Sequence, residues 1–145
     1  MQAQTFGEAS EYPQLTLLIV DDDRAVREAC QAIAGSLSMR TLAGASAREG
    51  LALMEQTPVD VVLTDLRMPG MDGIRFLEAI RSLRPDVFVI VMSGYGSIES
   101  AVESMQKGAT AFISKPFLMT DLYSVLEKKL GSRLSASPET VGAEE

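Results

Sequence analysis

A chain of 145 residues with 46% hydrophobic residues can bury the core of one domain, so its composition excludes an intrinsically disordered protein. Its net charge of −7 provides no basic face for nucleic acid, and the absence of histidine together with a single cysteine excludes histidine metal sites, Ser-His and Cys-His nucleophilic pairs and internal disulfides. No apolar run is long enough to span a membrane and the N-terminal segment lacks the features of a signal peptide, so we expect a cytoplasmic protein that binds neither membranes nor nucleic acid.

Five short apolar runs, most of them rich in β-branched residues, predict buried strands. They cover residues 15–20, 40–43, 59–64, 86–92 and 110–114, and the second run is the weakest. Helix-like stretches separate the runs. This alternation predicts a doubly wound α/β sandwich with a parallel sheet.

Capping signals and apolar spacing locate the helices between these strands. We expect a helix after residues 21–23, one capped by Ser46 and closed at 57–58, one from 72–73 to 84–85, one from Ile98 to 107–108, and one that stops near Gly131. The polar segments at 1–13 and 133–145 have no hydrophobic period and predict flexible tails around a single domain at 14–132.

Four of the predicted strands run into reactive polar side chains. Asp21 and Asp22 follow the first strand, Asp65 the third, Ser93 the fourth and Lys115 the fifth. Because ligands of open parallel sheets bind beyond the carboxyl ends of the strands, these side chains are expected to converge at one edge. Each one alone also fits an ordinary role as a helix cap, turn residue or surface charge. Their joint occurrence at four strand ends favours a common site.

The residue types at this edge suit phosphoryl transfer. Three clustered carboxylates are unfavourable unless a cation is bound or a proton is taken up, and hard carboxylate oxygens suit Mg²⁺. The Ser93 hydroxyl would donate to a phosphoryl oxygen, and the Lys115 ammonium would offset the acid charge and bind phosphate.

Four motifs of the chain resemble those of the receiver domain of two-component response regulators. The motifs are LLIVDDD, VVLTDLRMPGMDG, VMSGYGS and AFISKPF, and the resemblance covers residues 15–131. The stretch VMSGYGSIESAVESMQKGATAFISKPF is most similar to receivers of nitrogen-regulation-type transcriptional activators. The resemblance implies a five-stranded flavodoxin-like fold and phosphorylation of an aspartate by a sensor histidine kinase or a phosphotransfer protein.

The resemblance also implies roles for the residues of the acid cluster. Asp65 would be the phosphoacceptor. Asp21 and Asp22 would hold Mg²⁺, together with Asp65 and the main-chain carbonyl of Arg67. The expected function is a phosphorylation-activated signalling switch, with self-phosphorylation and slow autodephosphorylation as its own chemistry, and no turnover of an external substrate.

A switch of this kind needs residues that sense the phosphoryl group. By resemblance, Ser93 and Lys115 would bind it, and Phe112 occupies the aromatic switch position. Movement of Ser93 and Phe112 would alter the face of the fourth and fifth helices, which would control an output domain or partner protein or form a homodimer on phosphorylation. Arg67 and Tyr95 flank the phosphoryl group, and neither offers a carboxylate or amide to orient water. We therefore expect a relatively long-lived phosphoryl group.

Two other functions use a similar set of residues. A Mg²⁺-dependent phosphohydrolase with an aspartyl-phosphate intermediate, as in haloacid-dehalogenase-like enzymes, would carry its nucleophile on the first strand, where residues 21–23 superficially fit. The chain is short for such an enzyme and offers no cap over the site. A flavodoxin-like FMN carrier is disfavoured because acids at the first strand end would repel the FMN phosphate.

Overall fold

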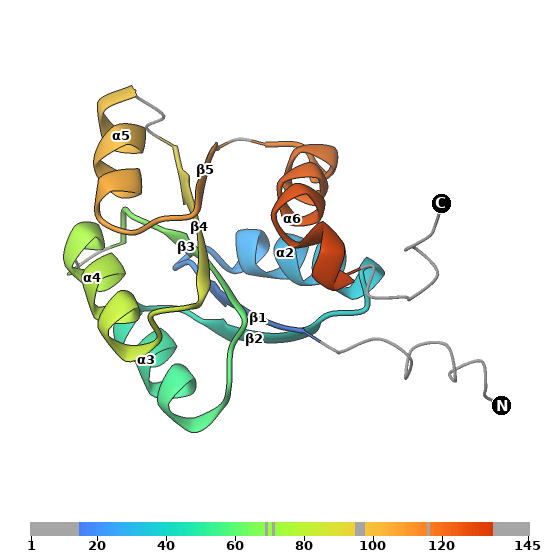
Figure 1. Ribbon diagram of the computed structural model, residues 1–145, viewed down its shortest axis with the longest axis horizontal. Helices are drawn as coiled ribbons and strands as arrows, with labels where there is room; N and C mark the ends of the chain where they lie inside the picture. The colour runs from blue at the N-terminus through green and yellow to red at the C-terminus, as the bar shows by residue number, and fades with distance from the viewer. Residues whose placement is uncertain (1–14, 69, 71, 95–97, 116, 135–145) are drawn as a thin grey trace, which may run out of the picture.

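The computed structural model describes residues 15–68, 70, 72–94, 98–115 and 117–134, which form an open α/β sheet structure (Figure 1). Five parallel strands are hydrogen-bonded in the order β2-β1-β3-β4-β5. The strands are β1 (Thr16–Val20), β2 (Arg40–Gly44), β3 (Val61–Asp65), β4 (Phe88–Ser93) and β5 (Ala111–Ser114). The helices are α2 (Arg24–Ser36), α3 (Ala47–Gln56), α4 (Gly73–Leu83), α5 (Ile98–Gln106) and α6 (Met119–Leu134). The predicted doubly wound, five-stranded parallel sheet is confirmed.

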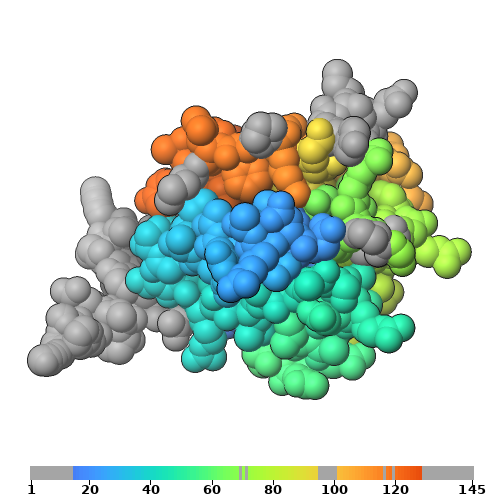
Figure 2. All heavy atoms as spheres, turned by 180° about the vertical axis from the view of Figure 1, so that it is seen from behind, coloured from blue at the N-terminus to red at the C-terminus, as the bar shows by residue number. Residues whose placement is uncertain are grey.

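Helices cover both faces of the sheet. The chain leaves β1 towards β2 and then returns past β1 to β3, β4 and β5, so right-handed crossovers place α3, α4 and α5 on the face opposite to α2. The last helix, α6, returns to the face of α2 (Figure 1). On the side of the molecule shown in Figure 2, α2 in blue lies against α6 in orange.

Alternating side chains of the central strands β1, β3 and β4 fill two separate cores. Leu17 and Ile19 of β1 point into the core under α2 and α6, whereas Leu18 and Val20 point into the core under α3 and α4. All four side chains are fully buried. Apolar residues on both faces explain why these strands read as continuous apolar runs in the sequence.

The predicted caps begin the helices at the expected residues. Asp23 caps α2 by accepting a hydrogen bond from the Ala25 amide. Ser46 caps α3 by accepting from the Glu49 amide, while the Glu49 carboxylate accepts from the Ala45 amide. These reciprocal bonds satisfy amides that the first turn of a helix leaves without a partner. A third cap at Asp72 begins α4 and thereby fixes the end of the loop that follows β3.

The last helix is longer than the sequence suggests. Gly131 predicts the helix end, but α6 continues to Leu134, so the expected domain boundary at 132 falls inside this helix. A glycine costs a helix about 1 kcal/mol, which does not stop it when the following residues are helix-compatible. Within the described residues, none of the helices combines the length and apolar character that a membrane span requires.

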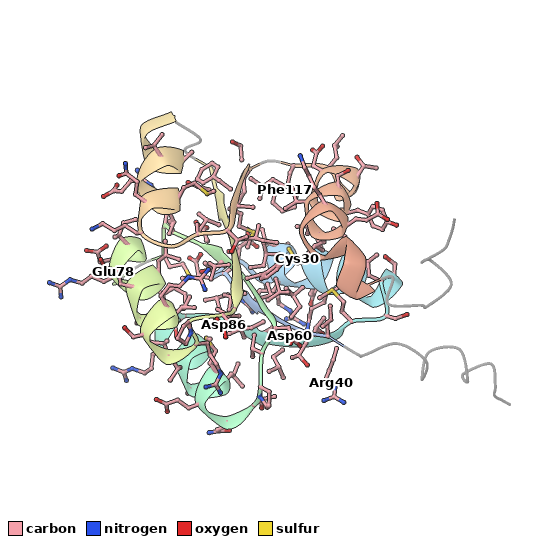
Figure 3. All side chains as sticks on the ribbon, in the orientation of Figure 1. Cys30, Arg40, Asp60, Glu78, Asp86 and Phe117 are labelled. Atoms are coloured by element: carbon pink, nitrogen blue, oxygen red, sulfur yellow. The ribbon has the colours of Figure 1, made fainter. Side chains whose placement is uncertain are left out.

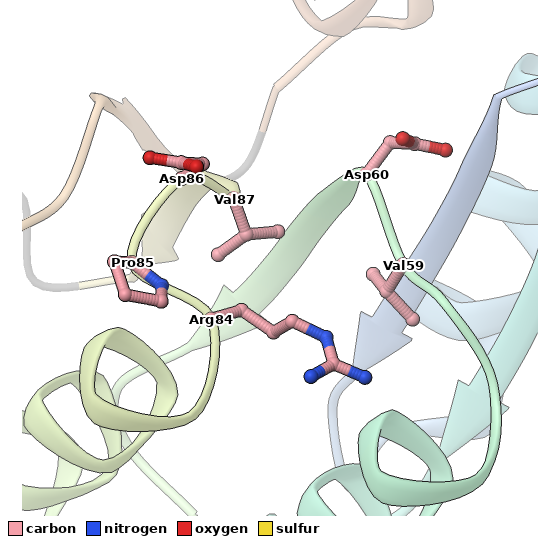
Figure 4. A pocket seen from close by; sticks show the side chains of 6 residues that line it. All are labelled: Val59, Asp60, Arg84, Pro85, Asp86 and Val87. Atoms are coloured by element: carbon pink, nitrogen blue, oxygen red, sulfur yellow. The ribbon is translucent and has the colours of Figure 1, made fainter.

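The amino-terminal edge of the sheet holds a small pocket of about 240 Å³ (Figure 4). It is lined by Val59, Asp60, Arg84, Pro85, Asp86 and Val87. The Arg84 guanidinium extends along this pocket and donates to the main-chain carbonyl of Met54 in α3 at 2.9 Å. A nearby arginine, Arg81, donates to the Gly108 carbonyl at 2.8 Å and to Thr110 Oγ1 at 3.2 Å. These arginines join α4 to its neighbours at the edge remote from the acid cluster.

Candidate functional site

The register of the sheet brings the predicted site residues to one edge. Val20 of β1 pairs with both Gly44 and Thr64, so the turn after β1 lies next to the end of β3. Asp65 is the last residue of β3 and pairs with Met92 in β4. Ser93, which follows Met92 in β4, pairs with Ser114 in β5. The carboxyl ends of β1, β3, β4 and β5 are therefore level, as the sequence predicts.

Three carboxylates meet at this edge. One oxygen from each of Asp21, Asp22 and Asp65 lies within 4.8 Å of the others. Asp21 is fully buried and Asp65 is 5% exposed, whereas Asp22 is exposed to solvent. The predicted proximity of these three residues is thus found in the structure, with two of the acids buried and one exposed.

Lys115 joins the two buried acids. Its Nζ lies 2.8 Å from Asp21 Oδ2 and 2.7 Å from Asp65 Oδ2, and its side chain is 20% exposed. Burial lowers the pKa of Lys115, but the hydrogen bonds and charges of the two carboxylates raise this pKa by more, so that the net change is upward. Lys115 therefore stays charged and compensates two carboxylates with one ammonium.

Backbone amides hold the remaining oxygens of these acids. The Asp23 amide donates to Asp21 Oδ1 at 2.8 Å, and the Arg67 amide donates to Asp65 Oδ1 at 2.8 Å. Both carboxylates are thus fixed by one amide and one ammonium. These bonds orient the Asp65 carboxylate at the carboxyl end of β3.

Ser93 and Phe112 lie on the strands that flank the acid cluster. Ser93 is 2% exposed, and its main-chain carbonyl accepts a hydrogen bond from the Lys115 amide at 2.8 Å. Phe112 pairs with Val91 in the sheet and packs, half-buried, against the core under α3 and α4. The backbone thereby connects the end of β4 to the lysine that contacts both acids.

The loop after Asp65 is packed closely against the start of α4. A Cβ atom on Gly73 would lie 2.4 Å from the Leu66 carbonyl oxygen and 2.9 Å from Leu66 Cα. Met68 is 6% exposed and belongs to the core under α3 and α4. The absence of a side chain at Gly73 therefore allows the loop to carry Arg67 back over Asp65.

The structure describes only one of the two residues that are expected to flank the phosphoryl group. The Arg67 side chain is exposed, and its amide contacts Asp65 as stated above. Tyr95 lies outside the described residues. Its expected role therefore stays a prediction.

One residue that contacts the site lies outside the sequence motifs. Arg27 in the first turn of α2 donates from Nη1 to the main-chain carbonyl of Asp21 at 2.8 Å. An arginine at such a position is usually a solvated side chain, and the sequence carries no signal for its partner. Asp21 precedes α2, so helical spacing could not indicate that Arg27 contacts it.

Cys30 of α2 lies in the core under α2 and α6 (Figure 3). Burial, assisted by the Asp21 carboxylate and opposed by Lys115, raises the pKa of the Cys30 thiol to about 11. A neutral, fully buried thiol is neither a nucleophile nor a metal ligand at neutral pH. Cys30 is therefore a core residue.

The donor set of the cluster fits a hard divalent cation. Among the described residues none donates a hydrogen bond to the Asp22 carboxylate, and Lys115 compensates the other two acids only in part. Carboxylate oxygens with one exposed side match the preference of Mg²⁺ for oxygen ligands and retained waters. The cluster can therefore accept a cation beside Lys115.

The family model and the most similar sequences point to the same protein family. The family model for the response regulator receiver domain matches residues 17–127. The transcriptional regulatory protein ZraR of Escherichia coli (strain K12) is 34% identical over 129 residues, which are 89% of this chain and 29% of ZraR. The C4-dicarboxylate transport transcriptional regulatory protein DctD of Rhizobium meliloti (strain 1021) is 39% identical over 102 residues, 70% of this chain and 22% of DctD. The chain thus spans less than a third of these relatives.

Solved structures agree with this result. A CheY-like response regulator receiver domain protein from Methanospirillum hungatei JF-1 has a TM-score of 0.78 at 34% identity and covers 86% of this chain with 100% of its own. NtrX from Brucella abortus has a TM-score of 0.77 at 30% identity, covering 83% of this chain with 28% of its own. Fold and sequence therefore point to the same group of proteins.

Proposed function

The chain belongs to the family of response regulator receiver domains, and on that premise we propose that it is a signalling switch that accepts a phosphoryl group on Asp65. The observation that carries the proposal is the environment of the Asp65 carboxylate. It ends a buried strand, contacts Lys115 Nζ at 2.7 Å and the Arg67 amide at 2.8 Å, and lies within 4.8 Å of two further carboxylates. The donor would be a sensor histidine kinase or a phosphotransfer protein.

The chemistry proposed for Asp65 is an in-line displacement. One Asp65 carboxylate oxygen attacks the phosphorus of the donor, the bond from phosphorus to the donor's leaving nitrogen or oxygen breaks, and an acyl phosphate forms. Lys115 would move from pairing two carboxylates to contacting the transferred group, so that its charge offsets the charge that gathers there. The Ser93 hydroxyl would donate to another phosphoryl oxygen.

A divalent cation would complete this site. The carboxylates of Asp21, Asp22 and Asp65 and the main-chain carbonyl of Arg67 would hold Mg²⁺. When bound, the ion supplies positive charge to the oxygens around phosphorus. Asp22 is the exposed acid of the cluster, so it would be the first protein ligand that an entering ion meets.

Family membership disfavours the phosphohydrolase alternative. Receiver domains act as signalling switches, so we propose no turnover of external substrate, and only self-phosphorylation from small donors and slow autodephosphorylation. The chain would act in the cytoplasm, with a sensor histidine kinase or a phosphotransfer protein as its source of phosphoryl groups. Because the relatives are much longer regulators, an output domain or a separate partner protein would receive the signal.

The experiment that tests the proposal is intact-mass measurement after incubation with acetyl phosphate and Mg²⁺. The wild type should gain one phosphoryl group that mild base removes. Asp65→Asn should gain none, because the amide oxygen is a far weaker nucleophile than a carboxylate. Asp86→Asn is the matched control, since the same substitution in an exposed loop at the opposite sheet edge should leave the adduct intact. An adduct on Asp65→Asn would contradict the proposal.

The phosphoryl group should be long-lived. Neither Arg67 nor Tyr95 offers a carboxylate or amide to orient the water that attacks phosphorus. We expect most of the label to stay on the purified protein through a desalting step with Mg²⁺ present, and Arg67→Asn to lose it several-fold faster. Rapid loss from the wild type would contradict this expectation.

The face formed by α5 and α6 would transmit the signal. The two helices lie on either side of β5, which carries Phe112 (Figure 1). Large apolar side chains are exposed along this face, namely Val102 at 48%, Met105 at 46%, Leu118 at 69% and Tyr123 at 40%. When Ser93 and Lys115 turn towards a phosphoryl group, Phe112 would move with them and change this face.

One outcome of that change would be a homodimer on phosphorylation. Wild-type protein treated with acetyl phosphate should sediment faster than untreated protein at high concentration. Tyr123→Glu should abolish the difference, because it places a charge within the exposed apolar face, while Glu28→Gln on α2 should not. Identical sedimentation of the phosphorylated and unphosphorylated wild type would contradict dimerisation through this face.

A further inference from the structure

Arg27 reaches from α2 back to the acid cluster. Its amide donates to the Asp23 carbonyl at 3.1 Å, as part of the first helical turn. Its side chain is half-buried and folds back towards the end of β1, where Nη1 donates to the Asp21 carbonyl at 2.8 Å. The guanidinium thus contacts the backbone of the turn that carries the two acids.

That contact fixes one of the two peptide groups that flank Asp22. The Asp21 carbonyl and the Asp22 amide belong to one rigid plane, so Arg27 holds that plane when it binds the carbonyl. The next plane contains the Asp23 amide, which donates to Asp21 Oδ1 at 2.8 Å. With both planes held, the direction of the Asp22 Cα–Cβ bond is set by the backbone.

The Asp22 side chain depends on this backbone control. Its carboxylate is exposed and receives no hydrogen bond from the described residues, whereas Asp21 and Asp65 are each held by an amide and by Lys115. Rotation of the Asp21–Asp22 peptide would therefore move the Asp22 carboxylate away from the other two acids without breaking any contact of its own.

We propose that Arg27 is a positioning residue, which orients the Asp22 carboxylate for the divalent cation by holding the Asp21 carbonyl. This inference rests on the Mg²⁺ site proposed above and assigns to that site a side chain that lies outside its motifs. Arg24 provides the contrast. It has the same charge on the same helical turn, but its side chain is 82% exposed and pairs with Glu28.

The sign of the effect separates positioning from simple charge. A nearby guanidinium repels Mg²⁺, so removing a charge alone would strengthen metal binding. Removing a residue that orients a ligand weakens metal binding, on the order of tenfold for contacts of this kind. The two roles therefore predict changes in opposite directions for the same substitution.

The test compares Arg27→Met, Arg27→Lys and Arg24→Met in the full chain. Mg²⁺ affinity is measured by calorimetry, and folding is checked by circular dichroism in EDTA. We expect Arg27→Met to bind Mg²⁺ on the order of tenfold more weakly than wild type. Arg27→Lys should be intermediate, because it keeps the charge and a donor but not the planar group. Arg24→Met should bind at least as tightly as wild type.

A second readout uses the adduct formed from acetyl phosphate. The Mg²⁺ concentration for half-maximal labelling of Arg27→Met should rise by about tenfold, while the labelling rate at saturating Mg²⁺ stays within about twofold of wild type. If Arg27→Met fails to fold in EDTA, Arg27→Lys carries the comparison, and wild-type affinity in Arg27→Lys then overturns the proposal.

Two other results would overturn the inference, and they are distinguishable. If wild type binds Mg²⁺ and Arg27→Met binds it as tightly as Arg24→Met, positioning by Arg27 is wrong while the proposed site stands. If wild type binds no Mg²⁺, the proposed metal site fails together with the role of Arg27.

Discussion

Replacing Lys115 by methionine is expected to lower the free energy of unfolding by about 3 kcal/mol when no divalent cation is present. Methionine keeps an unbranched stem of similar length but removes the ammonium that contacts Asp21 and Asp65. Two buried carboxylates, with Asp22 close by, then repel one another without compensation. Urea unfolding in EDTA, followed by circular dichroism, measures the loss.

Mg²⁺ should reverse much of this loss. A ligand at about 100 times its dissociation constant stabilises the folded state by about 2.7 kcal/mol. The effect should be larger in Lys115→Met than in wild type, because the ammonium no longer competes for the Asp21 and Asp65 oxygens. A difference between the two proteins that is unchanged by Mg²⁺ would contradict a shared role of the ammonium and the cation.

The contribution of Lys115 should also depend on pH. Its pKa is raised in the folded state, so its stabilising effect is complete below the ordinary lysine pKa of about 10.4 and disappears as the pH rises through the raised value. The difference between wild type and Lys115→Met should therefore shrink in this alkaline range. Lys107→Met is the control. Lys107 is 45% exposed and lies 3.6 Å from Glu78, so its removal should cost less than about 0.5 kcal/mol.

Gly73→Ala should destabilise the protein to a similar extent, for a steric reason. The alanine Cβ would lie 2.4 Å from the Leu66 carbonyl oxygen and 2.9 Å from two Leu66 carbons, and backbone atoms cannot move aside without shifting the loop. We expect Gly73→Ala to destabilise the protein by roughly 2–4 kcal/mol. Because the same loop presents the Arg67 amide to Asp65, the yield of the acetyl phosphate adduct should fall as well.

Gly35→Ala separates this clash from the general effect of replacing a glycine. No heavy atom lies within 4 Å of a Cβ at Gly35, which is exposed in α2. Alanine there should stabilise the protein by about 0.5 kcal/mol, since it favours the helix and restricts the unfolded chain. Equal and small effects of the two substitutions in urea unfolding would show that the contact between Gly73 and Leu66 carries no strain.

The sequence predicted the sheet and the acid cluster because both follow from local patterns. Buried strands on both faces give continuous apolar runs, and residues at the ends of parallel strands meet at one edge. Asp65 and Lys115 are 50 residues apart in sequence and still contact each other. The weakest predicted strand is β2 at the sheet edge, where most side chains are half-buried and the apolar signal is correspondingly low.

Other features could not be predicted because they depend on tertiary placement. Arg27 contacts a main-chain carbonyl, a group that every residue has, so no residue type in the sequence indicates this contact. The close approach of Gly73 to Leu66 depends on the path of the loop, and a glycine after Asp72 reads first as part of a helix start. The end of α6 was misplaced because a single glycine is a weak stop signal.

The position of the phosphoryl group decides whether Asp65 is the phosphoacceptor. Wild-type protein labelled with acetyl phosphate and Mg²⁺ is treated with borohydride, which reduces an acyl phosphate of aspartate to homoserine, and its peptides are then sequenced by mass spectrometry. We expect homoserine at position 65 and intact aspartate at positions 21 and 22. Homoserine at position 21 or 22, with Asp65 unchanged, would contradict this expectation.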